Sequence, residues 1–208
     1  MASFIKKIFI ISSLFISSTF HISAEAKPVE VCQSFIKNKT DIMLQIFHNT
    51  KLTESEKRRD LAVLFQESVD TDWIGKYILG HSWKNATEAE QKQYLKSYRE
   101  YITHTYVSKY NDEDTKDIYD IKISSVIPTQ QNEFLASTLI KVKDDDDIKI
   151  DYVLAQSADK CQVHDINIEG VSLILTQRSE FSAAAGFSGI NGVIKSMEKQ
   201  YKMITSSR

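Results

Sequence analysis

The feature that most constrains the fold is a change in hydrophobic period near residue 118. Before this point, apolar side chains recur every three to four residues, as on one face of a helix. From 118 to 169 they alternate with polar residues, as in half-buried strands. Helical spacing returns after residue 170. Helices, then strands, then helices predict an α+β domain in which helices pack on a sheet.

Capping signals predict where the helices begin and end. Pro28 suits the first turn of a helix that extends to about residue 49. Thr53 and Thr87 each have a glutamate three residues later, and these capping boxes predict two further helix starts. Between them, an aspartate at 70 or 72 can cap a short helix that ends at Gly80. Two closing helices are predicted at 171–185 and 190–203, separated by the glycine-rich stretch 186–192.

Four strands are predicted, at 118–127, 133–143, 148–156 and 160–169, and Pro128 is expected to end the first. Their short connections predict an antiparallel meander. Each strand has one apolar face, so the N-terminal and C-terminal helices are expected to cover one side of a curved sheet. The second and third strands are long and rich in apolar residues. We therefore expect an apolar cavity between the sheet and the helices.

Residues 1–26 have the layout of a secretory signal peptide. Lys6 and Lys7 precede an uncharged apolar run at 8–20, and Ala24-Glu25-Ala26 is an A-x-A cleavage site. The apolar run is shorter than the ~20 residues that a membrane span needs. We expect cleavage after Ala26 and one exported domain at 27–208. The net charge of −2 and the lack of an Arg/Lys stripe argue against a nucleic-acid partner.

The exported domain contains two cysteines, Cys32 and Cys161. A disulfide between them would persist in an oxidising compartment and would close a long loop. Alternatively, both are buried free thiols that pack as small apolar side chains. Spacing alone leaves both alternatives open, because a bridge requires the Cα atoms to lie within about 7 Å.

No catalytic or metal site is predicted. Cys161, His164 and Asp165 could suggest a thiol nucleophile with its base. Side chains alternate between the faces of a strand, however, so positions 161 and 164 are expected to point to opposite sides. The histidines lack the spacing of metal ligands. The four aspartates at 144–147 lack the glycine of a calcium loop and are expected to form a solvated turn.

Three stretches resemble a known protein family. Leu79, Gly80 and Trp83, within 69–102, match an LG-x-x-W pattern, and 164–174 matches a joint of the type EGVSL. RSEF follows at 178–181. Together they resemble the MlaC family of periplasmic phospholipid-binding proteins, also described as toluene-tolerance auxiliary components, over about residues 29–203. The chain departs from the pattern at Cys161, where the family has tryptophan, and at Thr176-Gln177, where it has Asn-Tyr.

The resemblance implies a cone-shaped fold similar to cystatin or ketosteroid isomerase, with acyl chains buried inside. It implies a periplasmic shuttle that helps to maintain outer-membrane lipid asymmetry. The cargo would be phospholipid, with no cofactor. The implied partners are an inner-membrane ABC transporter complex and an outer-membrane lipoprotein complex. Moving two acyl chains into water would cost tens of kcal/mol at ~0.8 kcal/mol per methylene, and an apolar cavity removes that barrier without any catalytic residue.

We expect the lipid to contact inward-facing side chains of the sheet, of the joint near 170 and of the adjoining helices. These residues are Tyr106, Ile140, Tyr152, Leu154, Ile168, Val171, Leu173, Ile174 and Phe181. A shift of one residue in any strand would reverse its assignment. Arg178 is expected to be a structural partner of Asp165 rather than a rim residue.

Two other functions remain as alternatives. The first is an enzyme that uses a similar cone for an apolar substrate, which requires an acid–base pair that converges in the pocket. The second is a structural adaptor between envelope complexes, which predicts a filled core without a cavity.

Overall fold

The structure is a computed structural model that describes residues 27–158 and 160–206. The predicted signal peptide at 1–26 lies outside the described residues. None of the helices in the described part of the chain combines the length and the apolar stretch needed to span a bilayer.

A five-stranded antiparallel sheet forms one half of the molecule, with the strands in sequence order. The strands are β1 (Ile118–Gln130), β2 (Glu133–Val142), β3 (Ile148–Ser157), β4 (Lys160–Ile168) and β5 (Val171–Ser172). The helices are α1 (Pro28–His48), α2 (Glu54–Ser68), α3 (Thr71–Leu79), α4 (His81–Asn85), α5 (Glu88–Val107), α6 (Asp112–Thr115) and α7 (Leu173–Ser206). The predicted α+β class is therefore confirmed.

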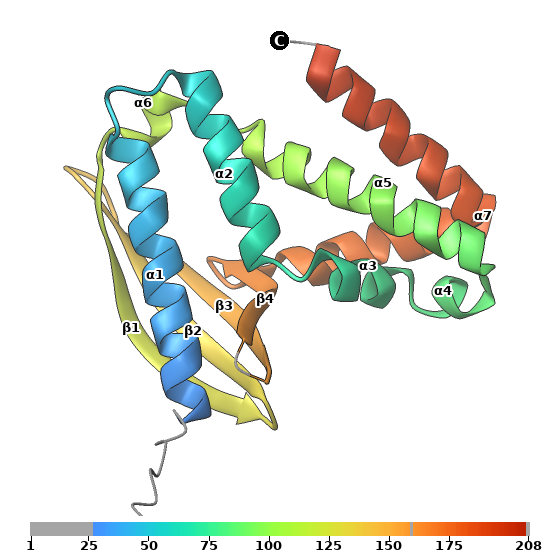
Figure 1. The fold of residues 1–208 in the computed structure, drawn as a ribbon, viewed down its shortest axis with the longest axis horizontal. Coiled ribbons are helices and arrows are strands. Elements are labelled where there is room, and N and C mark those ends of the chain that lie inside the picture. Colours follow the sequence, from blue (N-terminus) through green and yellow to red (C-terminus); the bar gives the residue numbers. More distant parts are fainter. Residues whose placement is uncertain (1–26, 159, 207–208) are drawn as a thin grey trace, which may run out of the picture.

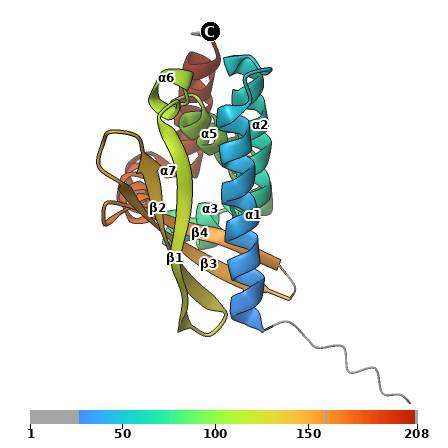
Figure 2. The same ribbon diagram turned by 90° about the vertical axis from the view of Figure 1, so that its left-hand side faces the viewer.

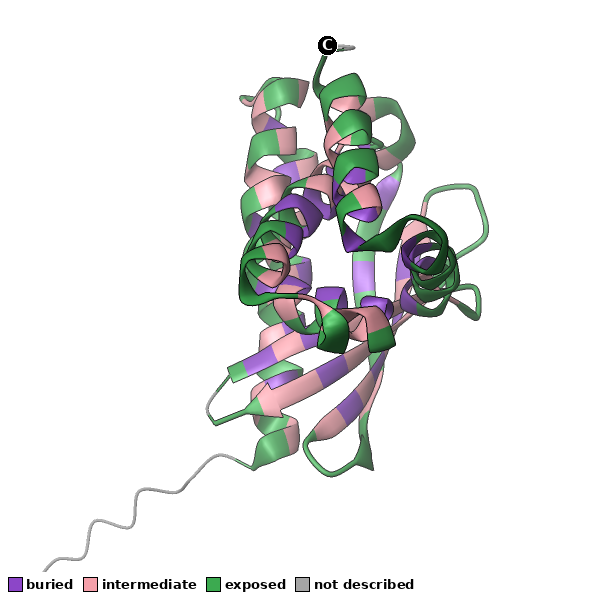
Figure 3. Ribbon diagram, turned by 90° about the vertical axis from the view of Figure 1, so that its right-hand side faces the viewer, coloured by how far each residue is buried: buried purple, intermediate pink, exposed green. Residues whose placement is uncertain are grey.

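Helix α1 lies across one face of the sheet, and α2 runs beside α1 (Figures 1 and 2). Helices α3, α5 and α7 pack on one another and extend away from the sheet (Figure 1). Buried residues form stripes along the helices and strands, while the outer turns are exposed (Figure 3). The space enclosed by α1, α2, the end of α5 and the sheet is where the candidate site lies.

The predicted caps are present at the helix starts. The hydroxyls of Thr53 and Thr87 accept hydrogen bonds from the backbone N–H groups of Glu56 and Glu90, and both glutamates complete a capping box. Asp70 caps α3 by accepting from the backbone N–H of Trp73 at 2.9 Å. These interactions satisfy backbone donors that a helix N-terminus leaves unpaired.

The strand predictions need two corrections. Pro128 does not end β1, which continues to Gln130. Because β1 is an edge strand, the missing N–H of proline does not interrupt the sheet. The sheet also has five strands rather than four, since Val171 and Ser172 turn back through Glu169 and Gly170, with φ of 50° and 84°, to pair with β4. Helix α7 therefore begins at Leu173, not at residue 171.

The closing segment is divided in two as predicted. Gly189, with φ of 66° and ψ of 173°, interrupts the helical backbone of α7. A positive φ is accessible to glycine at little cost because it has no Cβ. The bend places the last part of α7 alongside α5 (Figure 1).

Close contact between α3 and α5 depends on Gly75. A Cβ built on Gly75 would lie 3.0 Å from a ring carbon of Tyr98 and 3.1 Å from a methyl of Leu95. The absence of a side chain lets the hydroxyl of Tyr94 donate a hydrogen bond to the Gly75 carbonyl at 3.1 Å. The tyrosines of α5 are thus largely core residues, with Tyr94 and Tyr98 almost fully buried.

Candidate functional site

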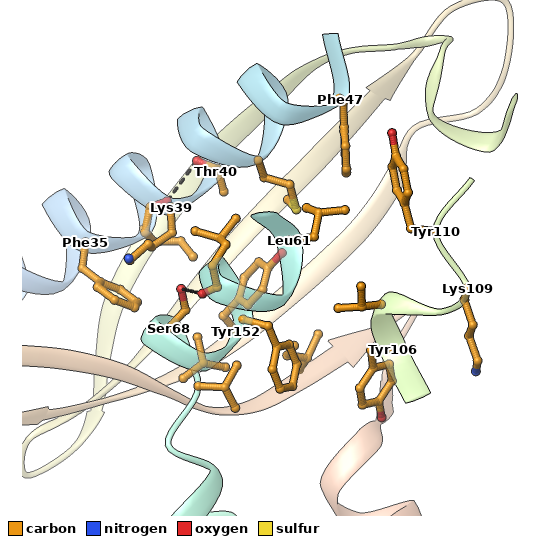
Figure 4. A pocket seen from close by; sticks show the side chains of 18 residues that line it. Phe35, Lys39, Thr40, Phe47, Leu61, Ser68, Tyr106, Lys109, Tyr110 and Tyr152 are labelled. Atoms are coloured by element: carbon orange, nitrogen blue, oxygen red, sulfur yellow. Dashed lines mark hydrogen bonds between the residues drawn. The ribbon is translucent and has the colours of Figure 1, made fainter. Parts of the chain in front are cut away.

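The main cavity lies between α1, α2, the end of α5 and strands β3 and β4, and has a volume of about 380 Å³. This is within the range of about 300–1,000 Å³ for small-molecule pockets. Most of the lining is apolar, and Figure 4 shows the aromatic rings directed into one space. The lining residues are Phe35, Ile36, Lys39, Thr40, Met43, Phe47, Leu61, Leu64, Phe65, Ser68, Val69, Tyr106, Val107, Lys109, Tyr110, Tyr152, Val163 and Ile166.

The hydroxyls of Thr40 and Ser68 in the wall are already hydrogen-bonded to protein atoms. Thr40 Oγ1 donates to the Ile36 carbonyl at 2.9 Å, and Ser68 Oγ donates to the Leu64 carbonyl at 2.6 Å. A hydroxyl that donates to its own helix offers little to a polar ligand. The wall is therefore suited to a hydrocarbon rather than to a ligand that needs hydrogen bonds.

One end of the cavity is closed by an ion pair and an aromatic stack. Lys57 is 6% exposed, and its Nζ lies 2.8 Å from Asp112 Oδ1 and 2.9 Å from the Phe47 carbonyl. The hydrogen bond with Asp112 raises the pKa of Lys57 above its ordinary value. Tyr110 donates to the same carboxylate, and its ring stacks on Phe47 at 5.6 Å. The polar groups face one another, so the rings present apolar surface to the cavity (Figure 4).

A second, smaller cavity of about 20 Å³ lies behind Tyr106. Its wall includes Phe65, Tyr106 and Ile166 of the main cavity, together with the start of α7. Gln177 Nε2 donates to the Tyr106 hydroxyl at 2.9 Å, and Gln177 Oε1 accepts from the Tyr98 hydroxyl at 2.8 Å. Burial raises the pKa of Tyr106, so this phenol stays neutral near pH 7. Gln177, a departure from the family pattern, thus fixes the wall between the two cavities.

Cys32 and Cys161 form a disulfide that joins α1 to β4, with a Cα–Cα distance of 5.3 Å. Both residues are buried. A sulfur in a disulfide is not a thiolate nucleophile, so Cys161 does not supply the catalytic thiol considered from the sequence. The bridge also anchors the first half of α1, one turn before Phe35 and Ile36 of the cavity wall.

A β-bulge in β4 decides which residues face the cavity. Val163 pairs with Leu154 and Asp165 pairs with Val153, so His164 has no partner in the ladder. An extra residue shifts the alternation of side chains along a strand. Val163 and Ile166 consequently both line the cavity although they are three residues apart. His164 instead stacks on Trp73 at 3.9 Å, with its Nε2 3.5 Å from Asp70 Oδ2.

The structure brings together only part of the predicted lining. Tyr106 and Tyr152 line the main cavity, and Tyr106, Leu173 and Ile174 line the small one. Burial raises the pKa of Tyr152 to about 12. Ile140, Leu154 and Phe181 are buried in the core but are not among the lining residues of either cavity.

Two of the predicted residues are exposed. Ile168 is 39% exposed and Val171 is 59% exposed. Both lie where β4 turns into β5, at the end of the sheet. Neither residue is among the lining residues of the two cavities, and a lipid contact at either position stays a prediction.

The predicted pairing of Arg178 with Asp165 is also wrong. Asp165 accepts hydrogen bonds from Ser172 Oγ at 2.6 Å and from the backbone N–H groups of Ile166 and Ile174 at 2.7 and 3.2 Å. It therefore holds the joint between β4 and α7. Arg178 points elsewhere and lies 4.3 Å from the centre of the Tyr77 ring.

Sequence reasoning missed the contribution of the first two helices. Helix α1 provides Phe35, Ile36, Met43 and Phe47, and α2 provides Leu61, Leu64 and Phe65. Their helical spacing correctly indicated buried faces. Spacing could not show that a cavity separates these helix faces from the sheet. The apolar residues of a filled core and of a cavity wall recur at the same helical spacing.

The partly buried His164 should make the folded protein less stable in mild acid. Burial lowers its pKa below the usual 6.5 more than Asp70 raises it. The unfolded chain then binds more protons than the folded chain, so stability falls as pH decreases through about 6.5. Urea unfolding of wild type between pH 7.5 and 5 should show this decrease, and His164→Gln should show a smaller one. Equal slopes for the two proteins would contradict the assignment.

Comparison with known proteins gives two findings. The model of the MlaC protein family matches residues 37–199. A similar solved structure is that of the phospholipid-binding protein from Ralstonia solanacearum in complex with a phospholipid, with a TM-score of 0.64 and 13% sequence identity. The match covers 86% of this chain and 99% of that one. This likeness confirms the fold, and the family match over most of the sequence shows that the chain belongs to the MlaC family.

Proposed function

We propose that this protein is a phospholipid carrier that holds acyl chain in the main cavity and leaves the headgroup at its edge. The observation that carries the proposal is a mostly apolar cavity of about 380 Å³, in which the hydroxyls of Thr40 and Ser68 donate to backbone carbonyls. The solved relative in complex with a phospholipid supports the same assignment. The structural-adaptor alternative predicted a filled core, and the cavity argues against it.

The energetics of such a carrier follow from the burial of hydrocarbon. Each methylene removed from water contributes about 0.8 kcal/mol, so a chain of about 16 carbons gains roughly 13 kcal/mol when an apolar wall surrounds it. The membrane gives a similar gain, and the exchange between membrane and carrier is therefore close to balanced. A carrier of this type needs no catalytic group, which is consistent with Cys161 being in a disulfide.

Two lysines at the edge of the cavity indicate where the headgroup would lie. Lys39 and Lys109 are at opposite ends of the lining in Figure 4. Lys39 Nζ forms an ion pair with Glu67 at 3.0 Å, whereas Lys109 Nζ lies 5.9 Å from the centre of the Tyr106 ring. Lys109 is exposed and can approach a phosphate. We place the headgroup on the Lys109 side.

The cellular role extends this proposal. A periplasmic location would follow from cleavage of residues 1–26, and the carrier would exchange lipid with an inner-membrane ABC transporter complex and an outer-membrane lipoprotein complex. A carrier that serves two membranes needs a removable cargo, and the open, non-covalent cavity fits this need.

Extraction of the purified protein tests the proposal. Protein purified after export should contain phospholipid at close to one molecule per chain, measured by mass spectrometry and by phosphate analysis of the extract. Delipidated protein should take up phospholipid from vesicles, and the acyl chain should then fill the main cavity. Repeated absence of stoichiometric lipid, together with no uptake from vesicles, would refute the proposal.

A further inference from the structure

A groove on the outer side of α3 and α4 has a composition unlike that of the cargo cavity. It has a volume of about 550 Å³ and shares no lining residue with the main cavity. Its lining consists of aromatic rings and basic side chains, with Gly80 at the turn between the two helices. These side chains are Trp73, Lys76, Tyr77, His81, Trp83, Lys84 and Arg178.

The cations in the groove lie on aromatic rings rather than against carboxylates. Lys76 Nζ is 5.8 Å from the centre of the Trp83 ring, and the Arg178 guanidinium is 4.3 Å from that of Tyr77. Within residues 27–158 and 160–206, neither these two cations nor Lys84 forms an ion pair. Asp72, the one acidic residue of α3, forms an ion pair with Arg99 at 2.6 Å. The groove therefore keeps a local positive charge in a chain whose net charge is −2.

An exposed aromatic residue lies at the same end of the molecule. Phe187 is 96% exposed and lies just before the Gly189 bend of α7. Its neighbour Ser188 lines a depression with Ser82 and Asn85, so α4 separates this bend from the basic groove. Figure 1 shows α4 and the bend of α7 at one end of the molecule. Phe187 can therefore contact an apolar layer that meets this end of the molecule.

We propose that this end of the protein docks on the surface of an anionic phospholipid membrane. The lysines and Arg178 would contact phosphate groups, the tryptophans would lie at headgroup depth, and Phe187 would enter the outer part of the hydrocarbon. Trp, Tyr and basic residues favour this interface because their apolar bodies and polar ends match its two sides. An acidic peptide could also pair with the basic side chains of the groove, but it would not account for the exposed apolar ring of Phe187. The docking surface is separate from the cargo cavity and does not require the proposed function to be correct.

Vesicle flotation at low salt tests the docking surface. Wild type should float with vesicles of equal parts phosphatidylglycerol and phosphatidylcholine, and should bind pure phosphatidylcholine much more weakly. Lys76→Glu/Lys84→Glu should reduce binding to the anionic vesicles at least about tenfold, since each basic residue near such a surface contributes about fivefold. The control Lys51→Glu/Lys122→Glu makes the same charge change at exposed sites outside the groove and should stay within about twofold of wild type.

Phe187→Ser tests the apolar contact. It should weaken binding to the anionic vesicles about tenfold, while the preference for anionic over phosphatidylcholine vesicles stays unchanged.

The outcomes separate this proposal from the cargo proposal. Lipid content and melting temperature are measured on the same preparations, so a misfolded variant is recognised. Equal binding to both vesicle types, or wild-type binding by Lys76→Glu/Lys84→Glu, overturns the docking surface even if the cargo is present. Binding of an oligoglutamate peptide with no vesicle binding also overturns it, in favour of an acidic protein partner. Vesicle binding by a protein that never contains phospholipid would refute the cargo proposal alone.

Discussion

Phe65→Glu is expected to yield a folded protein that contains no phospholipid. Phe65 lines both cavities, and its ring stacks on Tyr106 at 6.0 Å between centroids. A carboxylate at this position would lie among apolar side chains, and burying an unpaired charge costs several kcal/mol. At about 1.4 kcal/mol per factor of ten, we expect acyl-chain affinity to fall at least about a hundredfold. Lipid extraction and mass spectrometry, normalised to the folded fraction by circular dichroism, measure the effect.

Val63→Glu is the matched control for this experiment. Val63 lies two residues earlier on α2, is 50% exposed and is not among the lining residues. It introduces the same charge on the same helix and should retain wild-type lipid content. Leu61→Trp is a second test without charge, because a larger side chain at this lining position reduces the free volume. Wild-type lipid content in both Phe65→Glu and Leu61→Trp would show that the cargo lies elsewhere.

The cavity also shows where local sequence signals stop being informative. Capping boxes at Thr53 and Thr87 act within one helical turn, so they located the starts of α2 and α5 correctly. The alternation of Phe134, Ala136, Thr138 and Ile140 likewise predicted the buried face of β2. Both signals depend on neighbouring residues alone.

The misassigned residues depend on tertiary structure. The bulge at His164 shifts the alternation of inward and outward side chains along β4. Val163 and Ile166 therefore both line the cavity, which strict alternation does not predict. The role of Pro128 depended on β1 being an edge strand, which no local pattern reveals. The apolar faces of α1 and α2 were visible, but their separation from the sheet is set by how α1, the disulfide and β4 are placed in space.

The second large effect is expected from loss of the disulfide. Cys32→Ala/Cys161→Ala removes a cross-link between residues separated by 129 positions, and such a long loop gives the unfolded chain much additional freedom. We expect the free energy of unfolding to fall by about 2–5 kcal/mol. The melting temperature should fall by roughly 5–20 °C for a domain of this size.

Reductant provides the internal control for the disulfide variant. Dithiothreitol should lower the melting temperature of wild type towards that of Cys32→Ala/Cys161→Ala, and should leave the variant unchanged. Because Cys32 lies one turn before Phe35 and Ile36, loosening α1 should also speed the release of bound phospholipid. A melting temperature that neither reductant nor substitution changes would mean that packing of α1 on the sheet holds the cavity wall by itself. The bridge would then not contribute to the stability of the domain, and an unchanged rate of phospholipid release would show that it does not retain the cargo either.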